Sequence, residues 1–336
     1  TWTRNNAATP CRRSNVSAAM QLSTPVALPA APFQLDPDRH VLTLGSCFAQ
    51  HIGQHIADAL PAGHALVNPF GPLYAPRVIA HHLGVLLDTQ PLPDATYFEG
   101  REGLWHNRWF STHVSAGDAA TCRAHTAAAL MQARESLRRA DVLVLTLGTD
   151  RHYRLHDGRL VANCHKQPAA DFTEQADTVD VLTLLLLEAV GRLRTQRPDL
   201  HIVWTVSPYR YAKYGLHASQ LSKARLLLAV DAVCAADERS VYFPAYEIVL
   251  DELRDYRFYA RDLLHPSDTA VEFIAERFAG WCFSPALCRF AAERARLMRA
   301  QNHRPLHPES DEHRAFRAKL REEVELFTEK WGFSPF

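Results

Sequence analysis

Residues 41–49 read VLTLGSCFA, and this stretch decides the fold class of the chain. Its first half is an apolar run that stops at Gly45, a pattern typical of a short buried strand. Beyond the glycine, apolar residues recur every four positions at Phe48, Ile52 and Ile56, which indicates one face of a helix. The stretch therefore predicts a strand that turns directly into an amphipathic helix.

The same pattern of strand and break returns three times, with helical patterns between the strands. Alternating strands and helices predict parallel strands joined by right-handed crossovers, with helices on both faces. We therefore expect an α/β fold, a three-layer α/β/α sandwich around a mainly parallel sheet. The predicted strands are 41–44, 141–147, 201–206 and 240–243, and the predicted helices are 122–139, 177–196, 218–236, 268–281, 285–303 and 311–329.

The remaining segments suggest how the chain is organised. Residues 1–38 are rich in Ala, Pro, Ser and Thr without a period, so we expect a mobile N-terminal tail. Residues 39–282 would form the main domain, interrupted at 61–121 by an insertion or lid with loop signals and aromatic residues. Residues 283–336 would form a C-terminal helical extension.

Composition excludes several function classes. Lys plus Arg and Asp plus Glu both number 37, so no net field favours a nucleic acid or membrane partner. The seven cysteines show no C-x-x-C spacing, which favours reduced thiols over a disulfide framework or a zinc ribbon. Without an apolar span or signal peptide, the cytoplasm is the default compartment, although an export signal could be missing because the chain begins at Thr1.

Ser46 follows the first predicted strand and lies near a helix N-terminus. Free backbone N–H groups and the helix dipole favour negative charge there, which suits an acyl oxyanion. The alternative is that Ser46 only caps the helix, a role that serine often fills.

Asp262 and His265 offer the other two members of a triad. A spacing of three lets the carboxylate reach the imidazole, fixing its tautomer so that the other ring nitrogen can accept a hydroxyl proton. The pair lies beyond the last predicted strand, where a loop can return to the carboxyl edge of the sheet.

The pentapeptide Gly45-Ser46-Cys47-Phe48-Ala49 resembles the signature of the GSCFA family, which is placed with the SGNH (GDSL-like) hydrolases. That resemblance implies an SGNH hydrolase-like, flavodoxin-like sandwich in which Ser46 is the nucleophile and Asp262 and His265 complete the triad. It implies no cofactor. The likeness spans roughly residues 40–282 and includes the blocks Asn68 to Tyr74, Leu145 to Thr149, Asn163 to Lys166, Thr205 to Pro208, Ser222-Lys223, Tyr256 to Tyr259 and His265 to Ser267.

The resemblance also implies an oxyanion hole made by the backbone N–H groups of Ser46 and Gly71. The wider SGNH pattern adds an Asn in the third block, but here no Asn follows Gly148. Three residues could supply the missing donor, namely Asn68, Thr149 and Asn163.

Four further residues are candidates for binding substrate, since sites gather at strand ends in such sheets. They are His165, Lys166, Ser207 and Arg210. A metal ion is not expected, because the adjacent Cys164 and His165 have no second pair of ligands nearby in the sequence.

We expect a serine esterase or O-acyltransferase that works through an acyl-enzyme on an acylated carbohydrate or a small ester. One alternative is a non-catalytic carbohydrate- or ligand-binding module on the same fold. Another is a thiol acyltransferase using Cys47. We favour Ser46 because one helical step rotates Cys47 by about 100 degrees, toward the core.

Overall fold

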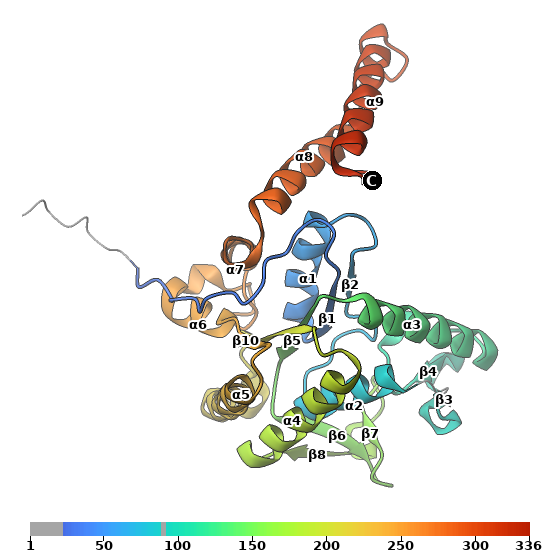
Figure 1. Cartoon of the computed structure of the whole chain (residues 1–336). Coiled ribbons are helices and arrows are strands. Elements are labelled where there is room, and N and C mark those ends of the chain that lie inside the picture. The colour runs from blue at the N-terminus through green and yellow to red at the C-terminus, as the bar shows by residue number, and fades with distance from the viewer. Residues whose placement is uncertain (1–22, 89–91) are drawn as a thin grey trace, which may run out of the picture.

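A computed structural model describes residues 23–88 and 92–336 of the chain. Its centre is a five-stranded sheet in the order β10-β9-β5-β1-β2, in which every neighbouring pair is parallel (Figure 1). Numbered one to five along the chain, these strands have the 2-1-3-4-5 order of flavodoxin-like folds. The strands are β1 (Val41–Gly45), β2 (Ala65–Val67), β5 (Val142–Leu147), β9 (His201–Val206) and β10 (Ser240–Tyr242).

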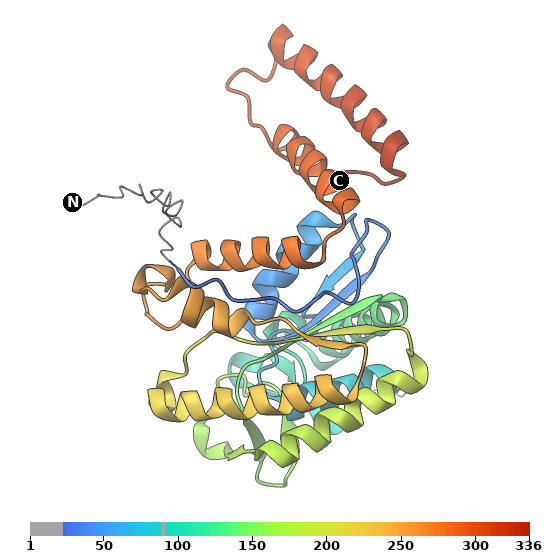
Figure 2. The same cartoon turned by 60° about the vertical axis from the view of Figure 1, so that its left-hand side comes forward.

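Helices cover both faces of this sheet (Figures 1 and 2). Side chains of β1 alternate between two apolar clusters, with Leu42 and Leu44 in one and Val41 in the other. The first cluster packs against α2 (Pro76–Leu87), α3 (Ala119–Arg139), α4 (Val179–Gln196) and α5 (Leu216–Ala236). The second packs against α1 (Cys47–Ala59) and α7 (Asp268–Cys282). The predicted three-layer α/β/α fold is confirmed.

Two small antiparallel sheets and several short helices complete the body. The sheets are β3 (Tyr97–Glu99) with β4 (Trp105–Asn107), and β7 (Leu160–Val161), β6 (Arg151–Leu155) and β8 (Phe172–Ala176). The short helices are α6 (Ala245–Glu247), a π-helix at Ile248–Leu253, and 3-10 turns at Asp94–Thr96, Arg101–Gly103, Thr112–Val114, Ala169–Asp171, Ala212–Tyr214 and Tyr256–Phe258. Residues 61–121 thus supply β2 and α2 to the sandwich, as well as the β3–β4 hairpin.

The described residues before β1 and after α7 are not part of the three layers. Residues 1–22, most of the predicted tail, lie outside the described residues. The rest of the tail is attached to the end of α7, because Leu35 N–H donates to Cys282 O (2.7 Å) and Leu35 O accepts from Ser284 N–H (2.9 Å). At the other end, α8 (Pro285–Gln301) and α9 (Asp311–Trp331) form a helical hairpin that projects from the body (Figure 2). Within the described ranges, every helix is too short or too polar to cross a membrane.

Strand order also indicates where a ligand would bind. The chain passes from β1 to β2 on one side and then returns to β5 on the other side of β1. In open parallel sheets, such a switch point opens a crevice at the carboxyl ends of the two strands.

Candidate active site

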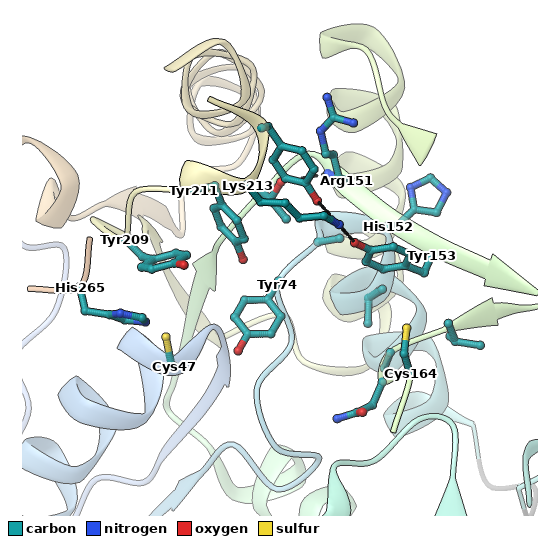
Figure 3. A pocket seen from close by; sticks show the side chains of 17 residues that line it. Cys47, Tyr74, Arg151, His152, Tyr153, Cys164, Tyr209, Tyr211, Lys213 and His265 are labelled. Carbon is teal, nitrogen blue, oxygen red and sulfur yellow. Dashed lines mark hydrogen bonds between the residues drawn. The ribbon is translucent and has the colours of Figure 1, made fainter. Parts of the chain in front are cut away.

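A pocket of about 380 Å³ lies at this switch point (Figure 3). The segments that follow β1, β5 and β9 contribute Cys47, Thr149 and Tyr209, and the loop before α7 contributes His265. The ends of β1, β5 and β9 therefore meet at one edge of the sheet, beside this pocket.

One turn holds both Asp262 and His265. Asp262 Oδ2 accepts from His265 Nδ1 at 2.5 Å, while Oδ1 accepts from the N–H groups of Leu264 (2.9 Å) and His265 (3.0 Å). These bonds lower the pKa of Asp262 to about 2 and stabilise Leu263 in the left-handed region at φ 59°. The Tyr209 ring lies against the imidazole, with centroids 4.2 Å apart. The Asp262 carboxylate therefore accepts a hydrogen bond from His265 Nδ1, and the other ring nitrogen, Nε2, stays available to the pocket.

Cys47 is the first residue of α1, and its side chain lines the pocket. Figure 3 shows its sulfur pointing into the space between His265 and Tyr74. Burial raises the pKa of the thiol, and the N–H groups of Phe48 and Cys47 and the charge of Lys223 lower it by less. The thiol is therefore protonated at neutral pH, and its use as a nucleophile requires a base.

Ser46 lies behind the pocket rather than in its lining. Its backbone is extended (φ −63°, ψ 177°), and it is the N-cap residue of α1, although its side chain makes no capping hydrogen bond. Ser46 is only 1% exposed, whereas Cys47, the next residue, lines the pocket. Ser46 Oγ has no hydrogen-bond partner, so the predicted hydrogen bond to His265 is absent.

Three of the predicted oxyanion donors make hydrogen bonds within the protein. They are the backbone N–H groups of Ser46 and Gly71 and the side-chain amide of Asn68. Ser46 N–H donates to Thr146 O (3.1 Å), and Gly71 N–H donates to Asn68 O (2.7 Å). The Asn68 side chain donates in turn to Ser46 O (3.3 Å). These bonds support the turn behind the helix start, so the three residues shape the site instead of pointing donors into it.

Thr149 and Asn163 do line the pocket. Asn163 Oδ1 accepts from His165 N–H at 2.8 Å, which orients the amide, and among the described residues its Nδ2 has no partner. The Thr149 hydroxyl lies 3.3 Å from Ser222 Oγ and 3.4 Å from an Asp150 carboxylate oxygen. Asn163 is therefore the better placed of the two to donate a hydrogen bond to a substrate.

The sequence of this chain matches two family profiles. The profile of the GSCFA family matches residues 40–278, which include β1, α1 and the Asp262–His265 turn. The chain belongs to the GSCFA family. The profile of the GSCFA domain protein C-terminal domain matches residues 295–334, which lie in the helical hairpin. No curated protein in the comparison matches this GSCFA chain significantly.

The four predicted substrate-binding residues lie outside the lining of the pocket in this GSCFA protein. His165 and Lys166 are consecutive residues with left-handed backbone (φ 48° and 56°), which turns the chain away from the site. His165 Nε2 bonds to Asn107 O (2.9 Å), and Lys166 is exposed. Ser207 is buried, with its Oγ accepting from Tyr209 N–H (3.4 Å). Arg210 lines a separate cavity.

Sequence reasoning gave little weight to the aromatic and cationic groups that do line the site. The tyrosines are Tyr74, Tyr153, Tyr209, Tyr211 and Tyr214. Lys213 lies on the far side from Cys47, where its Nζ donates to Tyr153 OH (2.8 Å) and contacts Glu174 (3.3 Å) (Figure 3). In the sequence, only the closely spaced Tyr209, Tyr211 and Tyr214 after β9 indicated an aromatic lining. Their positions depend on the loop conformation, which the sequence does not give.

Lys223 lies beneath the pocket and is fully buried. Its Nζ donates to Gly148 O (2.6 Å) and Ser207 O (2.7 Å), which joins the carboxyl ends of β5 and β9. Burial, together with the nearby charge of Arg210, lowers the pKa of Lys223 to about 7. The lysine therefore positions the two loops that carry Thr149 and the tyrosines. No group of three His, Cys, Asp or Glu side chains suited to a metal ion occurs in the described part of the chain.

Proposed function

We propose that this protein catalyses acyl transfer from an ester, with Cys47 as the nucleophile. In this proposal His265 is the general base, and Asp262 orients its ring. One observation carries the proposal: the Cys47 thiol and His265 line the same pocket, while Asp262 occupies the far ring nitrogen. A nucleophile, a base and a group that orients the base are the parts of a catalytic triad.

The reaction would proceed in two steps. His265 Nε2 accepts the thiol proton as Cys47 Sγ bonds to the acyl carbon, and the same nitrogen then gives that proton to the departing alcohol oxygen. Water or a second alcohol next gives its proton to His265 Nε2 as its oxygen attacks the thioester carbon, and the departing Cys47 thiolate takes that proton back. Hydrolysis and transfer then differ only in the acceptor. Among the described residues, Asp262 is the only side chain that hydrogen-bonds the His265 ring, so the bond between Nε2 and the thiol would form as substrate binds.

Negative charge on the acyl oxygen would be stabilised from two sides. The N–H groups at the start of α1 already face the Cys47 sulfur and lower its pKa. Asn163, which also lines the pocket, could donate to the same oxygen through Nδ2. Fixed donors of this kind are usually the largest electrostatic contribution to catalysis of acyl transfer.

The lining of the pocket supports an acylated carbohydrate or a small ester as substrate. Tyrosine rings offer flat apolar faces together with hydroxyl groups, which suit a ring that carries hydroxyls. The order of the site blocks resembles that of SGNH hydrolases, which often act on such esters. Ser46 stays an alternative nucleophile, although its hydroxyl would first have to leave the core.

Turnover of p-nitrophenyl acetate and of an acetylated sugar tests this proposal. Cys47→Ala and His265→Ala should each lower kcat by on the order of 10³-fold or more. Cys288→Ala, which removes an exposed thiol on α8, is the matched control and should keep full activity. A Cys47→Ala variant that retains most of its turnover would overturn the proposal. A folded wild-type protein that binds the acetylated sugar without turnover would instead favour the non-catalytic binding module.

A further inference from the structure

A second cavity, of about 270 Å³, lies on the other side of the loop that carries His265. Leu263 lines this cavity, and His265, two residues later, lines the first pocket. Arg210 N–H donates to Leu264 O at 3.1 Å, which ties the same loop to the segment after β9. The two cavities thus share one turn of the chain.

The walls of this second cavity are mostly apolar. Several of the side chains are unusually exposed for their type, since Tyr256 is 75% exposed, Leu216 58% and Leu263 54%. Clustered exposed apolar side chains often mark a binding surface. The apolar lining consists of Leu216, Val249, Leu250, Tyr256, Tyr259 and Leu263.

Arg210 provides the polar part of the cavity. Its Nε is buried without a hydrogen-bond partner, and among the described residues its guanidinium makes no hydrogen bond and no ion pair. Burial raises the pKa values of Tyr246 and Tyr259, and the charge of Arg210 lowers both by less, which places the guanidinium beside these rings. Arg210 is half-buried, and a partly buried cation without an acceptor is unfavourable, so an anion against it would be stabilising.

The other charged groups of the cavity limit the charge of that anion. Arg254 contacts Asp251 (3.4 Å), and Asp255 contacts Arg257 (3.7 Å). Arg210 is therefore the one uncompensated charge among the residues lining the cavity that the structure describes. The cavity therefore combines one positive charge, on Arg210, with an apolar lining. An amphipathic molecule with one negative charge is complementary to both.

We propose that this cavity binds the carboxylate of a medium-chain fatty acid, with the head group on Arg210 and the chain against the leucine and tyrosine side chains. The carboxylate pairs with the planar guanidinium, which is the geometry that arginine favours. The chain covers Leu216 and Leu263. A ligand here touches the turn that positions His265, and the site does not depend on the chemistry proposed for Cys47.

Calorimetric titration of the full-length protein with sodium decanoate, below its micelle concentration, tests the site. Decanol has the same chain without the charge and should bind at least tenfold more weakly. Arg210→Met should weaken decanoate at least tenfold, and Arg210→Lys should keep part of the affinity. Circular dichroism identifies any variant that fails to fold. If a variant does not fold, the affinities of the wild-type protein for decanoate and decanol are sufficient to test the proposal.

The apolar wall has a matched pair of variants on α5. Leu216→Asp places a carboxylate in the cavity and should weaken decanoate at least tenfold. Leu221→Asp changes an exposed leucine of the same helix outside the lining and should leave the affinity within twofold. Equal affinity for decanoate and decanol, absence of saturable decanoate binding, or equal effects of the two aspartates would each overturn the proposal.

Discussion

Asp262 contacts His265 through both of its carboxylate oxygens. Oδ2 accepts from the ring at Nδ1 (2.5 Å), and Oδ1 accepts from the backbone N–H of the same residue (3.0 Å). One side chain thus fixes the backbone turn and the direction of the imidazole together. Because both side chains are nearly half exposed, this pair matters for orientation more than for stability.

Replacing Asp262 by Asn should therefore separate orientation from folding. The amide Nδ2 cannot accept from Nδ1–H, so the imidazole loses its fixed tautomer, and kcat should fall by on the order of 10³-fold or more. The melting temperature should change little. Asp118→Asn, which alters a capping carboxylate at the start of α3, is the control and should leave kcat unchanged. Equal kcat values for Asp262→Asn and the wild type would contradict the role assigned to Asp262.

The pKa of Asp262 gives a direct spectroscopic prediction. Hydrogen bonds from His265 and Leu264 lower it to about 2, so the carboxylate should titrate near pH 2 in carbon-detected NMR. Its contribution to stability is present above the unfolded pKa and is lost as pH falls through about 2. In His265→Ala the pKa should rise toward its ordinary value. A wild-type titration near pH 4 would show that the turn is not formed in solution.

Lys223 should give the stability of the protein an unusual pH dependence. Its pKa is lowered to about 7 in the folded state, so between about pH 7 and 10 the unfolded chain binds the proton more tightly. Stability should therefore rise with pH in this window. Lys223→Met removes that rise and leaves two buried carbonyls without donors, which should cost about 1–3 kcal/mol each. Urea unfolding at pH 7 and pH 9 measures both effects, and identical pH dependence in wild type and variant would refute the assignment.

Gly71 is predicted to be required for backbone geometry. Its φ is 81°, and a Cβ there would lie 2.4 Å from Ser111 Cβ, whose backbone is fixed by a bond to Phe70 O (2.8 Å). Gly71→Ala should lower the free energy of unfolding by about 3 kcal/mol. Gly63 has a similar φ of 79° with open space around it, so Gly63→Ala should cost only about 1–2 kcal/mol. Chemical denaturation of both variants measures the difference. An equal loss of unfolding free energy in the two variants would show that the positive φ, and not the contact with Ser111, causes the destabilisation.

The sequence predicted the sandwich because its central strands are unusually uniform. Strands β1, β5 and β9 are apolar runs that end at a glycine or proline signal, and the helices between them have clear apolar faces. β2 is only three half-buried residues, β7 is only two residues, and β6 and β8 are largely polar, so none of these patterns stood out. Their positions depend on pairing partners that a single sequence does not reveal.

The contact between Asp262 and His265 was predicted from the sequence. The spacing of Asp262 and His265 sufficed because both residues belong to one local turn. The choice between Ser46 and Cys47 depended on where the helix begins. The side chains of these two consecutive residues differ in position, because Cys47 lines the pocket and Ser46 is buried. Periodicity does not locate a helix end that closely. Gly71 was predicted to be an oxyanion donor because it lies in the second sequence block of the family resemblance. In the structure its N–H donates to Asn68 O, a contact that depends on the folded turn.

The location of the acyl group in a trapped intermediate tests the central claim most directly. The full-length protein is mixed with p-nitrophenyl acetate, quenched in acid, digested and mapped by mass spectrometry. We predict an acetyl group on Cys47 that neutral hydroxylamine removes, and much less of it in His265→Ala, whereas acetylation of the exposed Cys288 should be the same in both proteins. An acetyl group on Ser46 with Cys47 unmodified would contradict the account.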